Sequence, residues 1–296
     1  MSQQDPAPIV VAGATGFVGT HVVRQLLAAQ LRPICLVRKG GRGIAPDLRG
    51  RCVETPVDYQ DPASLRAAIP SYSVIIHAIG TTRDTEALSL WETNYGITRD
   101  LLASATDPAG IVFFSGIGTA KAASDPYFQS KWRSEELIRR TGAGHVILRL
   151  SYIIGQGDEI VTPLMKSGEF EVIGDGKYRL QPILIDDVCA AVVSAVSMVS
   201  RVRLTMDMPG PETVSLLELV ELAANVSGHM PALSYVSVEN ALRRALKGGL
   251  PGTEEIVVML CDDLSASTEA YRTLGIQPTP LRRALEICRE RILKGA

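Results

Sequence analysis

The stretch IVVAGATGFVG at residues 9–19 constrains the fold of this chain more than any other feature. Residues 9–12 suit a buried strand, and Gly13, Gly16 and Gly19 follow at three-residue spacing. A strand, a glycine turn and a helix in this order are typical of a dinucleotide-binding unit. Gly13 permits the tight turn, Gly16 lets the backbone approach a pyrophosphate, and Gly19 lets the helix pack close to the strand.

The helix that follows the turn offers unpaired N–H groups and a partial positive charge at its amino terminus, which suit a phosphate. We therefore predict that the turn holds a dinucleotide. A purely structural turn is the alternative interpretation. The residues of the turn that we expect to contact the cofactor are Gly13, Thr15, Gly16, Phe17, Val18 and Gly19.

Short apolar runs alternate with longer amphipathic runs through the first half of the chain. This alternation predicts a parallel sheet covered on both faces by helices. A helix is expected over His21–Gln30. The expected strands are Ile9–Ala12, Pro33–Val37, Arg51–Val57, Val74–Ala78, Ile111–Ser115 and Val146–Leu150.

After about Leu150, glycines and prolines punctuate the chain, and further helices are expected over Leu216–Ser227, Val238–Leu246 and Leu281–Lys294. The predicted fold is α/β: a Rossmann-like, doubly wound parallel sheet with a smaller, mainly helical carboxy-terminal substrate lobe. Residues 1–150 and about 181–206 are expected to form the NAD(P)-binding core. Residues from about 151 to 180 and 207–296 are expected to form the lobe.

Composition excludes several other classes of protein. The net charge of −2 is spread without basic blocks, which argues against nucleic-acid binding. The apolar stretch at residues 189–199 is about half the length of a membrane span, and the amino terminus does not resemble a secretory signal. The five cysteines form no CxxC pair and the four histidines have no metal-ligand spacing. We expect a cytoplasmic protein without a metal site.

The end of the second strand indicates which cofactor binds. An acidic residue there would favour NAD, but the sequence CLVRKG places Arg38 at this position with Lys39 beside it. A guanidinium suits a 2′-phosphate through charge-assisted hydrogen bonds. We expect NADP(H) in preference to NAD(H). The alternatives are a solvated Arg38 or one that stacks on adenine without selecting between the two.

Two further segments extend the expected cofactor site. Asp58 ends the third strand, where it can reach the adenine amino group; alternatively it caps the helix that begins near Pro62. After the fourth strand, HAIG places the small residues Ala78 and Gly80 where the dinucleotide crosses the sheet edge.

Three separate segments carry candidate catalytic groups. Tyr127 and Lys131 in DPYFQSKW are spaced i, i+4, which puts a phenol and an ammonium on one face of a helix. The ammonium favours the phenolate and so helps the phenol to exchange a proton near neutral pH. Ser115 ends the fifth strand, where it can hydrogen-bond a substrate oxygen. Asn94, in a helical pattern, is expected to hold a water that connects Lys131 to solvent.

Taken together, GATGFVG, NYGITRDLL, SGIG, YFQSK and PILIDDV resemble the short-chain dehydrogenase/reductase superfamily in its extended or atypical branch. The segment 174–188 is most similar to members related to the nucleotide-binding accessory subunit of respiratory complex I. The resemblance covers roughly residues 8–205. It implies that Ser115, Tyr127, Lys131 and Asn94 form the catalytic tetrad, and that Lys131 also binds the nicotinamide ribose.

The chain departs from the pattern of this superfamily in two places. Residues 180–182 read Leu-Gln-Pro where sugar-nucleotide epimerases usually carry Arg-Asp-Phe, and Leu150 stands where a proline is common. The first departure weighs against a sugar-nucleotide substrate. The second bears on the loop near the nicotinamide.

These patterns favour an NADP(H)-dependent oxidoreductase that reduces a carbonyl or oxidises a secondary alcohol, with Tyr127 as the acid and base. Two alternatives stay open: an NAD(P)-dependent sugar-nucleotide epimerase or dehydratase, and a non-catalytic, cofactor-binding assembly or sensor protein. The expected partner is a small-molecule substrate, and a homodimer is possible on the faces of the flanking helices.

Overall fold

The computed structural model describes residues 7–85, 88–120, 123, 125–166, 168–246 and 265–294. The described residues form two compact units. The first comprises the chain up to Arg149 together with Cys189–Met206, and the second comprises Leu150–Val188 and the chain from Asp207 onward. The cofactor-binding and substrate-binding roles expected of the two regions stay predictions.

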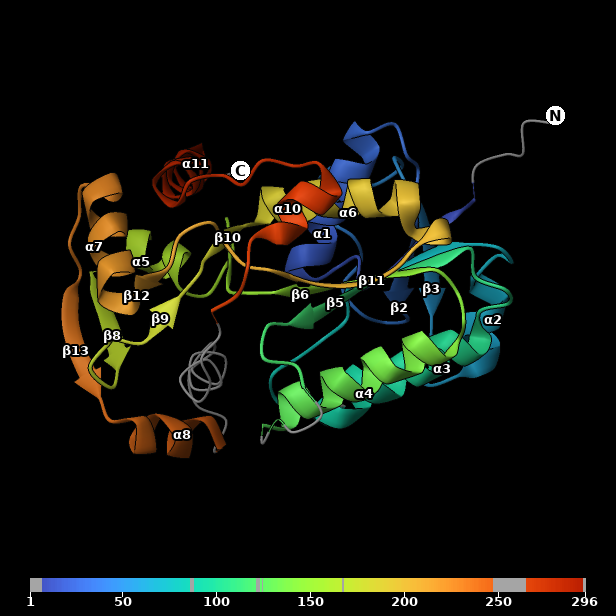
Figure 1. The fold of residues 1–296 in the computed structure, drawn as a ribbon, viewed down its shortest axis with the longest axis horizontal. Helices are drawn as coiled ribbons and strands as arrows, with labels where there is room; N and C mark the ends of the chain where they lie inside the picture. Colours follow the sequence, from blue (N-terminus) through green and yellow to red (C-terminus); the bar gives the residue numbers. More distant parts are fainter. Residues whose placement is uncertain are drawn as a thin grey trace. The chain divides into compact units, whose positions relative to one another are not determined.

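A seven-stranded sheet forms the centre of the first unit (Figure 1), with the strand order β11-β6-β5-β4-β1-β2-β3. β1 pairs in parallel with β2 and β4, β2 pairs in parallel with β3, and β4 with β5. From β1 the chain adds β2 and β3 on one side of the sheet, and it adds β4, β5 and β6 on the other side. The strand order therefore reverses between β1 and β4, and ligands of such sheets bind at this point. The strands are β1 (Ile9–Ala12), β2 (Ile34–Arg38), β3 (Val53–Val57), β4 (Val74–His77), β5 (Gly110–Gly116), β6 (His145–Leu150) and β11 (Arg203–Met208).

Helices cover both faces of this sheet (Figure 1). α2 (Pro62–Ala68), α3 (Ile97–Ser104) and α4 (Pro126–Arg140) lie on one face, and α1 (Phe17–Ala28) and α6 (Ile185–Met198) on the other. β1, β4 and β5 are buried along their whole length, as expected of strands that lie between two helical layers. The Rossmann-like fold class predicted from the sequence is confirmed.

The structure differs from the sequence prediction at one helix and one strand. The first helix spans Phe17–Ala28 instead of His21–Gln30, because the glycine turn leads directly into the helix and Gln30 has a left-handed φ of 63° beyond its end. The apolar periodicity marked only the buried stretch of the helix. The seventh strand, β11, was not predicted. Its residues are alternately exposed and half-buried at this edge of the sheet as far as the buried Met208, so they lack the continuous apolar run of the inner strands.

The second unit contains short paired strands and five helices among the residues that the structure describes. β8 (Glu169–Ile173) pairs in parallel with β13 (Ala232–Val236), β9 (Arg179–Leu180) pairs antiparallel with β12 (Val214–Ser215), and β10 (Ile183–Leu184) pairs with β7 (Ile153–Ile154). The helices are α5 (Val161–Lys166), α7 (Leu216–Ser227), α8 (Val238–Leu246), α10 (Glu269–Leu274) and α11 (Leu281–Lys294). The three helices predicted after Asp207 have the predicted bounds.

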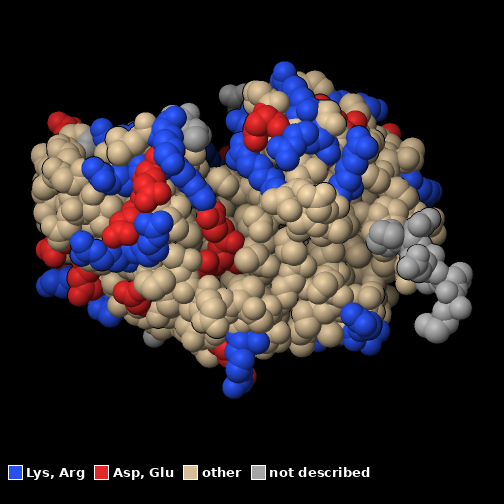
Figure 2. All heavy atoms as spheres, turned by 90° about the horizontal axis from the view of Figure 1, so that it is seen from above, with Lys and Arg blue, Asp and Glu red and all other residues tan. Residues whose placement is uncertain are grey.

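Charges of both signs are mixed on the molecular surface, as Figure 2 shows for one face. Exposed ion pairs such as Arg24–Asp47 and Arg283–Glu290 contribute to this mixture. Within the described residues, no helix has both the length and the hydropathy required to cross a lipid bilayer.

Candidate cofactor and catalytic site

The glycine turn after β1 is tightly packed at two of its three glycines. Gly13 has a φ of +90°, and a Cβ there would lie 2.8 Å from the carbonyl carbon of Ala78. A Cβ on Gly19 would collide with the Gly13 carbonyl oxygen. Neither obstacle is a flexible side chain, so substitution would force the backbone apart. Gly13 and Gly19 therefore have the packing roles predicted from their spacing.

The amino terminus of α1 is suited to an anion. Its N-cap, Gly16, offers no side-chain acceptor, and the first turn contains no acidic residue. A Cβ on Gly16 would meet only the Gly13 carbonyl oxygen at 3.4 Å, so the surface of the turn is open at this glycine. Helix amino termini of this kind attract phosphate groups. The turn thus fits the pyrophosphate of a dinucleotide, with Thr15, Phe17 and Val18 half-buried around it.

Three cations lie at the carboxyl end of β2. Arg38 and Lys39 are exposed, as a group that receives a ligand phosphate must be. The chain then turns back on itself: the Gly41 N–H donates to the Arg38 carbonyl at 3.0 Å, and Gly40 has a φ of +70°. This turn brings Arg42 to the glycine loop, where its guanidinium donates to the Thr15 carbonyl. Sequence reasoning missed Arg42: the pattern RKGGR shows a third cation beyond two glycines, but it does not show the distant carbonyl that this cation binds.

Asp58 is exposed at the end of β3, and its carboxylate accepts the Gln60 N–H at 2.9 Å. The cap of α2 is Asp61, which accepts the Ala63 N–H at 2.9 Å. The alternative interpretation of Asp58 as the helix cap is therefore wrong, and its contact with adenine stays a prediction. The next residue, Tyr59, was also missed. Its buried hydroxyl donates to the Leu36 carbonyl at 3.0 Å and accepts a hydrogen bond from the Gly13 backbone beneath the turn.

Lys131 is buried, with 3% of its surface exposed. Its Nζ donates to the carbonyls of Phe114 at 3.1 Å and Ile79 at 3.4 Å, and it lies 4.9 Å from the centre of the Phe113 ring. A Cβ on Gly80 would lie 2.7 Å from Nζ, so this glycine makes room for the ammonium. Burial lowers the pKa of Lys131 to about 8, and the charge of Glu135 opposes that shift.

Tyr127 lies in the first turn of α4, whose N-cap Asp125 accepts the Tyr127 N–H at 2.7 Å. The Lys131 Nζ is 5.9 Å from the centre of the Tyr127 ring. A Cβ on Gly116 would lie 3.3 Å from the Tyr127 hydroxyl, which places that hydroxyl beside the residue following Ser115. The structure therefore brings Ser115, Tyr127 and Lys131 together at the carboxyl end of β5.

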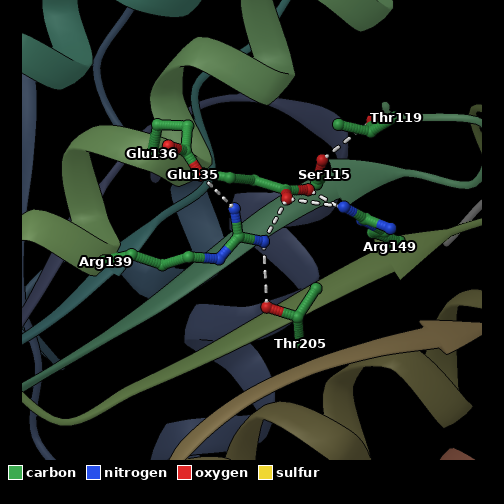
Figure 3. Close-up of polar contacts among 7 residues, drawn as sticks. All are labelled: Ser115, Thr119, Glu135, Glu136, Arg139, Arg149 and Thr205. Carbon is green, nitrogen blue, oxygen red and sulfur yellow. Dashed lines mark hydrogen bonds and ion pairs between the residues drawn. The ribbon is translucent and has the colours of Figure 1, made fainter. Parts of the chain in front are cut away.

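The Ser115 hydroxyl forms a hydrogen bond of 3.1 Å with the hydroxyl of Thr119, which is also buried (Figure 3). The loop that connects them is closed by a hydrogen bond of 3.1 Å from the Thr119 N–H to the Gly116 carbonyl. Sequence reasoning missed Thr119, since nothing in SGIGT indicates that the loop returns to the serine. The hydrogen bond to Thr119 therefore limits the orientations of the Ser115 hydroxyl.

Asn94 is fully buried in a π-helical turn, Glu92–Gly96, at the start of α3. Its side-chain amide donates to the Thr81 carbonyl at 2.8 Å and to the Ser130 hydroxyl at 3.0 Å, and it accepts the Thr81 N–H at 2.8 Å. Its backbone carbonyl accepts hydrogen bonds from Thr98 and Ser134. Both N–H groups of the amide thus bind protein, an arrangement that anchors the loop at Thr81. The role of Asn94 in holding a water stays a prediction.

His77, buried at the end of β4, links this loop to the π-helical turn. Its Nε2 lies 2.8 Å from the Thr98 hydroxyl, and its Nδ1 accepts the Ile79 N–H at 3.4 Å. Burial and the charge of Lys131 lower the pKa of His77 to about 3. His77 is consequently neutral at physiological pH and supports the loop that carries Ala78 and Gly80.

Lys177 and Arg179 are two cations of the second unit, where few charges converge that could bind a diphosphate substrate. Lys177 lies 3.7 Å from Asp175, and Arg179 lies 3.6 Å from Glu218 and donates to the Thr213 carbonyl at 3.0 Å. Both cations are thus already close to carboxylates of their own unit. These contacts, which are exposed and individually weak, add nothing in favour of a diphosphate substrate.

Comparison with known proteins identifies relatives of this chain. Residues 9–204 match the model of the NAD dependent epimerase/dehydratase family. A mitochondrial NADH dehydrogenase [ubiquinone] 1 alpha subcomplex subunit 9 of Arabidopsis thaliana is 28% identical over 251 residues, which are 80% of this chain and 61% of that protein. An NAD(P)H azoreductase of Xenophilus azovorans is 24% identical over 82% of each chain. The fold resembles UDP-glucose 4-epimerase of Thermotoga maritima, with a TM-score of 0.76, 17% identity, and coverage of 97% of this chain and 99% of that chain.

Proposed function

Since this chain belongs to the NAD-dependent epimerase/dehydratase family, we propose that it is an NADP(H)-dependent oxidoreductase that transfers hydride to a carbonyl or from a secondary alcohol. The observation that carries the proposal is the convergence of Ser115, Tyr127 and Lys131 at the end of β5. The family relationship supports a bound dinucleotide, and the site supports acid–base chemistry beside it.

In the direction of reduction, the Tyr127 hydroxyl donates its proton to the carbonyl oxygen, and the Ser115 hydroxyl donates a hydrogen bond to the same oxygen. The Lys131 ammonium stabilises the resulting tyrosinate by its charge. The nicotinamide cofactor, when bound, supplies the hydride. In the direction of oxidation, the tyrosinate accepts the proton of the alcohol.

The preference for NADP(H) is supported by the cations at the end of β2. Arg38 and Lys39 are exposed there, and Arg42 is held against the phosphate-binding turn by its hydrogen bond to Thr15. The described part of β2 carries no carboxylate at its end that would repel a 2′-phosphate. A guanidinium forms two parallel hydrogen bonds with a phosphate, which adds geometric selectivity to the charge attraction.

A titration of the purified protein with NADPH and with NADH, followed by nucleotide fluorescence, tests the cofactor assignment. We expect NADPH to bind at least about tenfold more tightly, which corresponds to about 1.4 kcal/mol. Equal affinities would remove the assigned role of Arg38 and favour an epimerase, in which hydride leaves and returns without net use of free cofactor.

The catalytic assignment is tested with Tyr127→Phe in an NADPH-consuming screen of aldehydes and ketones. We expect turnover to fall by about 10²–10⁴-fold, the contribution typical of general acid catalysis, while the affinity for NADPH stays unchanged. Tyr235→Phe is the matched control, because Tyr235 lies on β13 of the second unit with 60% of its surface exposed. Unchanged turnover in Tyr127→Phe would overturn the proposed acid–base role.

A second candidate is a non-catalytic, cofactor-binding member of a larger assembly. The observation that favours it is the similarity to a subunit of NADH dehydrogenase over 80% of this chain. Tight cofactor binding without turnover of any carbonyl or alcohol substrate, and equal behaviour of wild type and Tyr127→Phe, would support this candidate over the oxidoreductase.

A further inference from the structure

The buried ammonium of Lys131 has no ion-pair partner among the described residues. Its Nζ donates hydrogen bonds to the carbonyls of Phe114 and Ile79, which are neutral groups. A buried ammonium with neutral partners tends to lose its proton. Because the proposed function requires a positive charge beside Tyr127, a negative charge must come from elsewhere in the fold.

Glu135 is the buried carboxylate on the same helix, one turn beyond Lys131. Its side chain is 0% exposed, and the i, i+4 spacing puts it on the same face of α4 as Lys131. No other acidic residue of α4 is buried. Glu135 is therefore placed to act on Lys131 through the low-dielectric interior of the protein.

Two arginines hold the Glu135 carboxylate in place. Arg149, on β6, donates to its Oε1 at 2.8 Å and to its Oε2 at 2.7 Å, and Arg139 donates to Oε2 at 2.6 Å (Figure 3). Arg139 is itself held by Glu136 at 3.0 Å and by the Thr205 hydroxyl of β11 at 3.2 Å. These hydrogen bonds fix the position of the carboxylate.

This cluster also reaches the strand that bears Ser115. β6, which carries Arg149, is the neighbour of β5 in the sheet, and Ser115 lies at the carboxyl end of β5. We propose that Glu135, fixed by Arg139 and Arg149, is a positioning residue that supplies the counter-charge for Lys131 and so sets the pH range in which the site works. This role rests on the proposed function, in which Lys131 must be charged.

The other groups around Lys131 do not supply this charge. From β4 the nearest titratable group is His77, which is neutral, and β5 presents the Phe113 ring and a carbonyl. On α4 itself the Tyr127 ring lies near the ammonium, and the second carboxylate of the helix, Glu136, is 31% exposed and pairs with Arg139. Burial lowers the pKa of Lys131, and within the described part of the chain the charge of Glu135 opposes that shift.

The test measures the titration of Lys131 directly, by NMR of protein with ¹³C and ¹⁵N in its lysines, without cofactor or substrate. The Lys131 signal is assigned by its loss in Lys131→Met. In Glu135→Gln the two arginines lose their counter-charge, so we expect the titration midpoint to fall by about 1–3 pH units, the usual effect of a close charge. In Arg139→Met, a positive charge is removed and the midpoint is expected to rise.

Glu136→Gln is the matched control: it removes a carboxylate from the same arginine, but this side chain is 31% exposed, and we expect a much smaller shift. Glu135→Asp keeps the charge and should restore most of the midpoint, which also covers the case in which Glu135→Gln does not fold. If the cluster had a purely structural role, these substitutions would lower the stability of the protein. They would not shift the Lys131 midpoint down in Glu135→Gln and up in Arg139→Met. Equal midpoints in wild type, Glu135→Gln and Arg139→Met would overturn the inference.

The same variants separate this inference from the proposed function. If the NMR midpoints move as expected but no carbonyl substrate is reduced by NADPH, the inference about Lys131 stands and the oxidoreductase proposal fails. If the protein reduces a carbonyl substrate, the pH at which its turnover falls on the alkaline side should shift in Glu135→Gln by the same amount as the NMR midpoint of Lys131. A shifted midpoint with an unshifted limit would contradict the assigned role of Glu135 in the reaction.

Discussion

Replacing Gly80 by alanine should displace the Lys131 ammonium while leaving the fold intact. A Cβ at this position would lie 2.7 Å from Nζ, 3.3 Å from Cε of the same lysine and 3.4 Å from Oδ1 of Asn94. No backbone atom is among these neighbours. The strain therefore falls on the end of a flexible side chain, and Nζ must withdraw by about 0.5–1 Å to reach an ordinary contact distance.

This displacement is large enough to matter for catalysis. The hydrogen bond from Nζ to the Phe114 carbonyl is 3.1 Å long, and such bonds weaken quickly beyond about 3.2 Å. A shift of about 1 Å in an active site can lower the rate by about 10²-fold. We therefore expect kcat of Gly80→Ala to fall by about 10–100-fold. The melting temperature should change by only a few degrees, since about 1 kcal/mol shifts Tm by about 2–4 °C in a chain of this size.

The assay compares kcat, KM and thermal melting of wild type and Gly80→Ala with NADPH and one carbonyl substrate. Gly168→Ala is the control, because a Cβ there meets no atom within 4 Å and its φ is not in the left-handed region. A Gly80→Ala protein with the wild-type kcat would show that the position of Nζ is unimportant, and the assigned role of Lys131 would be refuted.

Three further predictions concern the same unit. Arg42→Ala should weaken NADPH binding by about tenfold or more and leave NADH binding nearly unchanged, which the fluorescence titration measures; equal losses for both nucleotides would instead indicate a damaged glycine turn. Lys131→Met should be more stable than wild type at pH 7, by at most about 3 kcal/mol from the lowered pKa. Because the pKa of Lys131 is lower in the folded protein than in the unfolded chain, the free energy of unfolding of wild type increases as the pH rises from about 8 to 10.5. Urea unfolding of wild type and Lys131→Met at pH 8 and pH 10.5 measures whether the difference in stability disappears. Thr119→Val should lower kcat through loss of the hydrogen bond to Ser115, and Thr119→Ser should restore it; a Thr119→Val enzyme with unchanged kcat would leave Ser115 independent of this hydroxyl.

Local sequence patterns predicted those parts of the fold that depend on near neighbours. The glycine spacing after β1 predicted the turn because a tight backbone path excludes side chains at Gly13 and Gly19, wherever the rest of the chain lies. The i, i+4 spacing of Tyr127 and Lys131 predicted their shared helical face for the same reason. Apolar β-branched runs predicted the inner strands, since only buried strands need them.

Other features could not be read from the sequence, because distant segments determine them. Nothing in the sequence near Arg42 indicates that it binds the carbonyl of Thr15, and Thr119 gives no local sign of its return to Ser115. The exposed edge strand β11 lacks an apolar pattern because water, and not a helical layer, faces part of it.

The sequence by itself determined the fold class, the cofactor-binding turn and the residue types that can perform acid–base chemistry. These features depend on residue spacing and side-chain size, which constrain the backbone over a few neighbouring residues. Only the tertiary structure decided the charge state of the site. Lys131 is buried against the residues after β4 and against β5, and its proposed counter-charge at Glu135 is fixed by guanidiniums from α4 and β6. The strength of a charge interaction depends on how much water the whole fold excludes from it, and this property has no counterpart in the linear order of residues.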